Sequence, residues 1–174
     1  MKKVLRNLIG SALVRWPVLA VMKIIEGFSR LSSVLRTAAL FPGPNRPICH
    51  WSVQVKNPGG ISFGKGVIIG PNCVLGGSGG ITFADGVRLS EGVVVETASL
   101  DLGGDPPYVH KMKPIVIGEG VWLCTRCIVL GGVTIGRRAV IGAGAVADRD
   151  VPERGVVRQR PGAAQANPKV CAPI

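Results

Sequence analysis

Ile61-Ser-Phe-Gly-Lys-Gly is followed by Val67-Ile-Ile-Gly-Pro-Asn and Cys73-Val-Leu-Gly-Gly-Ser, so an apolar residue returns every six positions. After two extra residues, Gly79 and Gly80, three more hexads begin at Ile81. The repeat is lost near Ala98 and returns at Ile115, from where six hexads run without a break. Two blocks of six hexads therefore flank one interruption, and such regularity is the signature of a repeat architecture.

Each hexad predicts a short strand of about three residues followed by a turn, with its first residue pointing inward and its glycine supplying an unusual backbone angle. Three hexads close one triangular coil, and coils stack at the ~4.8 Å spacing of neighbouring strands. We therefore expect a parallel β-helix of about four coils over residues 61–151, interrupted by an excursion loop at 99–113. Residues 41–60 are expected to form a connector and a partial first coil, and 152–174 a C-terminal tail.

The composition agrees with one β-rich domain. Of 174 residues, 25 are glycine and 13 proline, yet 47% are hydrophobic and the mean hydropathy is +0.36, which excludes a disordered Gly/Pro segment. The net charge of +11 favours an anionic partner: nucleic acid, a membrane surface or a phosphate-rich small molecule. Because no aromatic–basic pattern or recognition motif accompanies the charge, we expect no nucleic-acid binding. Five irregularly spaced cysteines predict no disulfide framework and favour a cytoplasmic protein.

Residues 1–40 lack the hexad repeat and show the apolar spacing of amphipathic helices. Pro17 predicts a break there, with a second helix beginning near it. Two roles fit this segment. It could cap the open end of the β-helix, or its basic, amphipathic character could hold it on an anionic membrane at the inner face.

The hexads, together with the segment Pro114-Ile-Val-Ile-Gly-Glu-Gly-Val-Trp-Leu, resemble the left-handed parallel β-helix of the hexapeptide-repeat acyltransferases. Over residues 50–165 the chain is most similar to the maltose/galactoside and colanic-acid O-acetyltransferase branch. The resemblance implies an all-β homotrimer with N-terminal helices that transfers an acetyl group from acetyl-CoA to a sugar hydroxyl. The expected acceptor is a sugar or a lipid-linked sugar in surface-polysaccharide biosynthesis, and no metal is expected.

The resemblance places a general base at the start of the excursion, where the family motif reads approximately Thr-Gly-Ser-His-Asp. This chain has Thr97-Ala-Ser-Leu-Asp101, so Leu100 occupies the position of the histidine. His110 lies in the same excursion and is the candidate substitute base, with Asp101 as its orienting partner. Two other readings stay open: His110 as part of a cationic patch, and the whole chain as a catalytically silent trimeric scaffold or binding module.

For the donor, the resemblance implies that coenzyme A lies along a groove between neighbouring subunits. The matching positions are Thr125, Ala143, Arg149 and Arg160, with Asp148 in place of the family's usual threonine. Arg149 matches the family's usual lysine near the pyrophosphate. Because arginine suits phosphate oxygens, Arg158 and Arg160 are candidates for the 3′-phosphate, and a role in solubilising a polar tail stays open for them. Cys124 and Cys127 form a CxxC without a second pair, so we expect them to pack in the core rather than to bind zinc.

Overall fold

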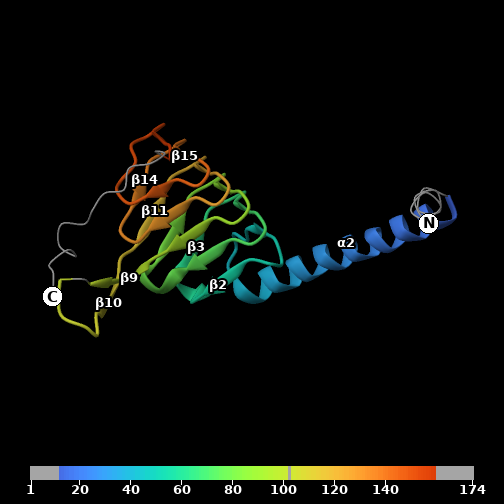
Figure 1. Cartoon of the computed structure of the whole chain (residues 1–174), viewed down its shortest axis with the longest axis horizontal. Helices are drawn as coiled ribbons and strands as arrows, with labels where there is room; N and C mark the ends of the chain where they lie inside the picture. The colour runs from blue at the N-terminus through green and yellow to red at the C-terminus, as the bar shows by residue number, and fades with distance from the viewer. Residues whose placement is uncertain (1–11, 102, 160–174) are drawn as a thin grey trace, which may run out of the picture.

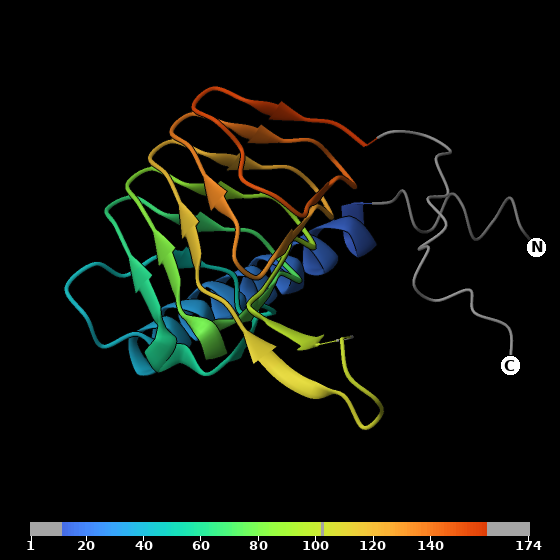
Figure 2. The ribbon, with the colours of Figure 1, turned by 90° about the vertical axis from the view of Figure 1, so that its left-hand side faces the viewer.

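The computed structural model describes residues 12–101 and 103–159 as one N-terminal helix followed by a parallel β-helix of about five coils (Figure 1). The predicted fold class is confirmed. The coils stack into three parallel sheets that form the faces of a triangular prism, which Figure 2 shows most clearly.

The three sheets are named here by the order in which the chain first visits them. The first sheet contains β1 (Ile48–Cys49), β4 (Ile68–Ile69), β7 (Arg88–Leu89), β12 (Trp122–Leu123), β15 (Val140–Ile141) and β17 (Val156–Val157). The second sheet contains β2 (Gln54–Lys56), β5 (Val74–Gly76), β8 (Val94–Glu96), β13 (Ile128–Leu130) and β16 (Val146–Ala147). The third sheet contains β3 (Ile61–Phe63), β6 (Ile81–Phe83), β11 (Ile115–Ile117) and β14 (Thr134–Ile135).

Two short 3-10 turns and one hairpin interrupt the coils, all three at the corner between the second and third sheets. The turns are η1 (Pro58–Gly60) and η2 (Gly77–Gly79), and η2 accommodates the extra residues of the second coil. In the third coil the chain leaves this corner as the antiparallel hairpin β9 (Ala98–Asp101) and β10 (Val109–Met112). The predicted excursion is therefore an ordered two-stranded ribbon.

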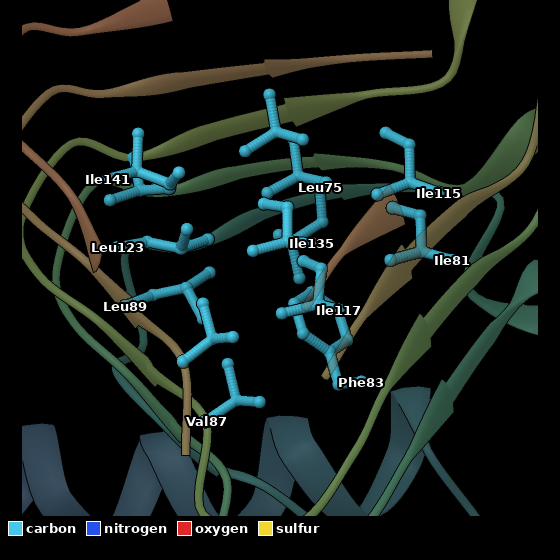
Figure 3. Packing of buried hydrophobic residues seen from close by; sticks show 14 of the residues in the cluster. Leu75, Ile81, Phe83, Val87, Leu89, Ile115, Ile117, Leu123, Ile135 and Ile141 are labelled. Atoms are coloured by element: carbon cyan, nitrogen blue, oxygen red, sulfur yellow. The ribbon is translucent and has the colours of Figure 1, made fainter. Parts of the chain in front are cut away.

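The core is a column of aliphatic side chains inside the prism (Figure 3). The first residue of each hexad points inward as expected, and so does the third, while the second faces out. Val121 and Leu123, for example, are both fully buried around the exposed Trp122. Parallel pairing in register stacks equivalent positions of successive coils, so inward residues contact inward residues along the whole length.

Glycines serve two separate purposes in the hexad. Positive φ angles occur at the sixth position, as at Gly86 (67°) and Gly120 (65°). At the fourth position the neighbouring coil comes close instead: a Cβ on Gly118 would lie 2.8 Å from the backbone nitrogen of Arg137. The sequence predicted one kind of glycine, with an unusual backbone angle. The structure shows two kinds: the sixth-position glycine adopts that angle, and the fourth-position glycine leaves room for the neighbouring coil.

Two differences from the expected layout concern the ends of the solenoid. The first coil is complete, because β1 and β2 join β3, so the structure has about five coils where the sequence indicated four. Its first two faces lack the hexad pattern and were therefore not counted from sequence. At the other end, β17 continues the first sheet into the segment expected to be a tail.

The N-terminal segment also differs from expectation, since α2 (Ala12–Leu40) is one continuous helix that includes Pro17. Proline has no backbone N–H to donate to the preceding turn of a helix. The 23 residues that follow Pro17 contain no further proline, so the helix continues to Leu40. Phe41, just after α2, enters the core and meets Phe63 edge-on at 4.8 Å between ring centroids. Within residues 12–101 and 103–159, no helix is long and apolar enough to cross a membrane.

Candidate active site

The hairpin β9–β10 is the main feature that projects from the solenoid besides α2 (Figures 1 and 2). Its root is fixed by Thr97, which is fully buried. The Thr97 Oγ1 donates to the carbonyl of Gly76 and accepts a 2.8 Å hydrogen bond from the backbone N–H of Gly79. The Thr97 carbonyl in turn accepts from the N–H of Lys113 at 3.1 Å. The two ends of the excursion are thus tied to the second and third coils.

His110 and Leu100 are directly paired partners in this hairpin. Directly opposite residues of an antiparallel pair share one face, with Cβ atoms about 4.5–5.5 Å apart. The imidazole of His110 therefore lies beside the position where the resemblance expects the base, and both side chains are exposed. His110 reaches this position from the facing strand β10, because it pairs directly with Leu100 of β9.

Asp101, by contrast, lies on the opposite face of the ribbon from His110. It pairs with Val109, and successive residues of a strand point to opposite sides. Its Oδ2 lies 3.7 Å from the Lys111 Nζ, and its Oδ1 accepts from the N–H of Gly103 at 3.2 Å. The structure does not bring Asp101 and His110 together, and Asp101 stabilises the hairpin tip instead.

Glu96 is a carboxylate at the hairpin root that the motif comparison missed. It accepts a hydrogen bond from the N–H of Ala98 at 3.2 Å and lies 3.5 Å from the Lys56 Nζ. These contacts set where β9 begins. The signal in the sequence was an acid at the fourth hexad position, where the equivalent residue of the preceding coil is Gly76.

Two of the expected donor residues, Thr125 and Ala143, stack on the corner between the first and second sheets. They occupy equivalent turns of the fourth and fifth coils, and the N–H of Gly144 donates to the Thr125 carbonyl at 3.0 Å. Both side chains are small and exposed, which leaves the turn backbone accessible to a ligand.

Arg149 lies on a different edge, the corner between the second and third sheets that also carries the hairpin. Its Nε lies 3.1 Å from the Asp148 Oδ1. The hydrogen bond between the two side chains lowers the pKa of Asp148 and raises that of Arg149. In one chain the donor residues are thus divided between the two edges of the second sheet. Arg160, the remaining matching position, lies outside the described residues.

Cys127 and His50 have structural contacts. Cys127 is fully buried, and desolvation raises the pKa of its thiol to about 12. Cys124 does not pack in the core as expected, because it is half-buried at the turn beside Cys127. The Nδ1 of His50 lies 2.8 Å from the Ser52 Oγ in the turn between β1 and β2. Over residues 12–101 and 103–159, no three histidine, cysteine or acidic groups gather as a metal site would require.

The solenoid of hexads with one hairpin excursion defines the class of hexapeptide-repeat β-helices. Residues 114–147 match the family described as bacterial transferase hexapeptide (six repeats), and residues 66–97 match the hexapeptide repeat of succinyl-transferase. Both matches are to hexapeptide-repeat transferases, so the resemblance that the motifs indicated is confirmed.

Several relatives carry names that describe an acetyltransferase. A galactoside O-acetyltransferase of Lactococcus lactis is 33% identical over 95 residues, covering 53% of this chain and 46% of the relative. A serine acetyltransferase of Bacillus pumilus is 34% identical over 102 residues, covering 59% and 40%. The chain thus spans less than half the length of these curated relatives.

A solved structure extends the likeness over most of the chain. The hexapeptide-repeat acetyltransferase of Vibrio cholerae superimposes with a TM-score of 0.60 at 26% identity, covering 74% of this chain and 78% of that one. The same protein has been crystallised with acetyl coenzyme A, and that structure gives a TM-score of 0.61 at 24% identity.

Proposed function

We propose that this protein is an acetyl-CoA-dependent O-acetyltransferase whose general base is His110. The observation that carries the proposal is the direct pairing of His110 with Leu100. A neutral imidazole at that place has the lone pair that Leu100 lacks, and it is exposed to an incoming acceptor.

In the proposed reaction, His110 first accepts a proton and later returns it. The imidazole takes the proton of an acceptor hydroxyl while that oxygen attacks the carbonyl carbon of the acetyl thioester. The C–S bond then breaks, and the imidazolium returns the proton to the departing coenzyme A thiolate. Acetylated acceptor and free coenzyme A are the products, and His110 ends in its starting form.

We infer that the acceptor is a sugar hydroxyl. The named relatives act on a galactoside and on serine, so a hydroxyl group is what their acceptors share. The hairpin motif of this chain resembles that of the sugar branch, which favours the sugar. A role on a lipid-linked sugar in surface-polysaccharide biosynthesis, at the cytoplasmic face of a membrane, extends this proposal.

The divided donor residues support a homotrimer. From the second to the fifth coil, the first residues of the second sheet's strands face outward and form an apolar column in register: Val74, Val94, Ile128 and Val146. Gln54 continues this column in the first coil. If this sheet faces a threefold axis, the edge with Thr125 and Ala143 of one copy approaches the neighbouring copy's edge with Arg149 and the hairpin. The donor site is then completed between copies, which accounts for its being split within one chain.

A catalytically silent scaffold is the second candidate, and Leu100 is the observation that favours it. It shares the trimer with the first proposal and differs in lacking turnover. Binding of acetyl-CoA is the first discriminator, because it requires no knowledge of the acceptor. A bound donor should stabilise the native state by ~2.7 kcal/mol at a hundredfold excess over its Kd.

The catalytic test compares His110→Ala with His50→Ala, which removes the other histidine of the chain. Release of free coenzyme A thiol with a panel of sugar acceptors should fall by roughly 10²–10⁴-fold in His110→Ala and stay unchanged in His50→Ala. Donor affinity measured by calorimetry should be the same in both variants. Unchanged turnover in His110→Ala overturns its role, and wild type that binds no acetyl-CoA at millimolar concentration supports the scaffold.

A further inference from the structure

Helix α2 presents its apolar side to solvent. Val21, Ile24, Phe28, Leu31 and Leu35 are spaced alternately by three and four residues, so they form one stripe along the helix, defined here as the outer stripe. Their exposed fractions run from 54% to 73%, with Phe28 the highest. Figure 1 shows α2 extending away from the solenoid, so no other described element covers this stripe.

The side of α2 that faces the solenoid is the polar one. Thr37 is buried and Ser33 half-buried, and their hydroxyls donate to carbonyls one turn earlier in the helix at 2.7 and 2.8 Å. Arg36 also donates to the carbonyl of Trp51 in the first coil. An amphipathic helix normally buries its apolar face on its own domain. Here the contacts with the first coil hold the helix with that face outward, ready for another partner.

The charge distribution identifies the chemistry of that partner. Residues 1–50 contain eight lysines and arginines and a single acid, Glu26, whereas residues 51–159 contain eleven basic and nine acidic residues. Most of the net charge of the chain is therefore concentrated in the segment that carries the outer stripe. An apolar stripe within a strongly basic segment is complementary to a surface that is apolar inside and anionic outside.

A second copy of α2 fits these observations less well. Packing two such helices along the outer stripe would bring together segments of the same positive sign. The positions that flank the stripe, such as Ile25, Ser32 and Val34, are uncharged, so they provide none of the opposite-charge pairs that stabilise and orient coiled coils.

We propose that α2 docks this protein on a membrane surface rich in anionic phospholipids. The outer stripe enters the boundary between headgroups and acyl chains, and Lys23 and Arg30, on the other side of the helix, reach the phosphates. The helix lies in the plane of the surface, because a spanning orientation would place Lys23, Glu26 and Arg30 in hydrocarbon. The proposal is independent of the catalytic role of His110.

The test is cosedimentation of the full chain with vesicles of phosphatidylcholine containing about one third phosphatidylglycerol, compared with phosphatidylcholine alone. Three variants are measured: Ile24→Ser, Phe28→Ser and, as the matched control, Met22→Ser. Met22 is an exposed apolar residue of the same helix (52%) that lies outside the outer stripe. All three substitutions remove apolar surface without changing charge.

We expect binding to the anionic vesicles only, with affinity that falls as salt is raised. Ile24→Ser and Phe28→Ser should each weaken binding by about tenfold or more, and Met22→Ser by less than about twofold. Sedimentation velocity should give the same oligomeric state for all variants. Acetyl-CoA binding should also be unchanged, which separates this proposal from the catalytic one.

Three results would overturn the proposal. Wild type that does not bind the anionic vesicles excludes the membrane as the partner. An equal loss in Met22→Ser removes the role of the outer stripe. A change of oligomeric state in Ile24→Ser or Phe28→Ser assigns the stripe to contacts between copies of the chain.

Discussion

Gly118 and Gly120 lie two residues apart in one turn and are required for different physical reasons. A Cβ on Gly118 would lie 2.8 Å from both the Arg137 nitrogen and the Ile135 carbonyl oxygen, which are backbone atoms of the next coil. Gly120 has φ at +65°, and its nearest neighbour would be the flexible Arg138 Cγ at 3.6 Å. The first glycine fixes the spacing of the coils and the second fixes the turn.

We predict that Gly118→Ala costs more stability than Gly120→Ala. The first forces two coils apart and should cost about 2–3 kcal/mol, whereas the second imposes a left-handed angle on alanine and should cost about 1 kcal/mol. Urea unfolding followed by circular dichroism measures both. Equal losses would show that neighbouring coils can separate without penalty.

Asp148 stands where the family usually has threonine, and it keeps Arg149 paired within the chain. Since the pKa of Asp148 is lowered, chiefly by its hydrogen bond from Arg149, the carboxylate is ionised at neutral pH and the pair persists there. In the proposed donor site, a phosphate that binds Arg149 must therefore displace Asp148. As pH falls through that lowered pKa, protonation releases the arginine.

We predict that Asp148→Thr tightens acetyl-CoA binding by about two- to fivefold, the range of an exposed ion pair. Calorimetry at pH 7 measures the change. Glu153→Thr is the matched control, since Glu153 lies 4.0 Å from Arg154 in a similar exposed pair. If both substitutions tighten binding equally, the effect comes from net charge and gives Arg149 no specific role.

Much of the residue pattern could be predicted from sequence because hexad position dictates burial. The first residue of every counted hexad lies inside, as expected, including Cys73 and Cys127. The inward third residue was not predicted, although aliphatic residues such as Leu75 and Leu123 occupy it. The two glycine roles could not be separated either, because one depends on the distance between coils.

At the scale of elements, the hairpin depends on the single buried hydroxyl of Thr97. Its Oγ1 is the partner of both the Gly79 N–H and the Gly76 carbonyl. A valine there has almost the same shape but leaves the Gly79 N–H without that partner, while the Gly76 carbonyl keeps its 3.2 Å hydrogen bond from the Thr97 N–H. Unpaired buried polar groups cost about 1–3 kcal/mol.

We therefore predict that Thr97→Val loosens the hairpin and lowers turnover, while Thr97→Ser retains both. Hydrogen exchange should show faster exchange of the hairpin amides, including those of Leu100 and His110, in Thr97→Val alone. Slow exchange in Thr97→Val would mean that the hairpin is held by its tip rather than by its root.

The hairpin and α2 each have one feature that could not be predicted from the sequence. The excursion could be located because the hexad phase stops, but the pairing register of β9 with β10 could not. That register decides that His110 faces the same side as Leu100 and that Asp101 does not. Likewise, the apolar spacing predicted that residues 1–40 are helical, and only the structure shows the outer stripe facing away from the solenoid.

For the whole molecule, the three faces of the prism differ in the chemistry of their outward columns. In the second sheet, Ile128 pairs with Val94 and Val146, so its column is apolar. In the third sheet, Val116 pairs with Thr82 and Thr134, which makes that column mainly polar. In the first sheet the column is also largely apolar, but Arg88 interrupts it between Ile68 and Trp122. A face that contacts other copies should be apolar, and the uninterrupted column from Val74 to Val146 favours the second sheet.

We predict that Ile128→Lys breaks the trimer and that Val116→Lys does not. Both substitutions place a cation at the centre of an outward column, but only the first would bury three cations near a threefold axis. Sedimentation velocity should give the mass of three 18.2 kDa chains for wild type and Val116→Lys, and of one chain for Ile128→Lys. Acetyl-CoA binding should be lost together with the trimer, because Thr125 and Arg149 then lie on edges that no longer meet. A monomer that binds the donor as wild type does would place the whole donor site within one chain.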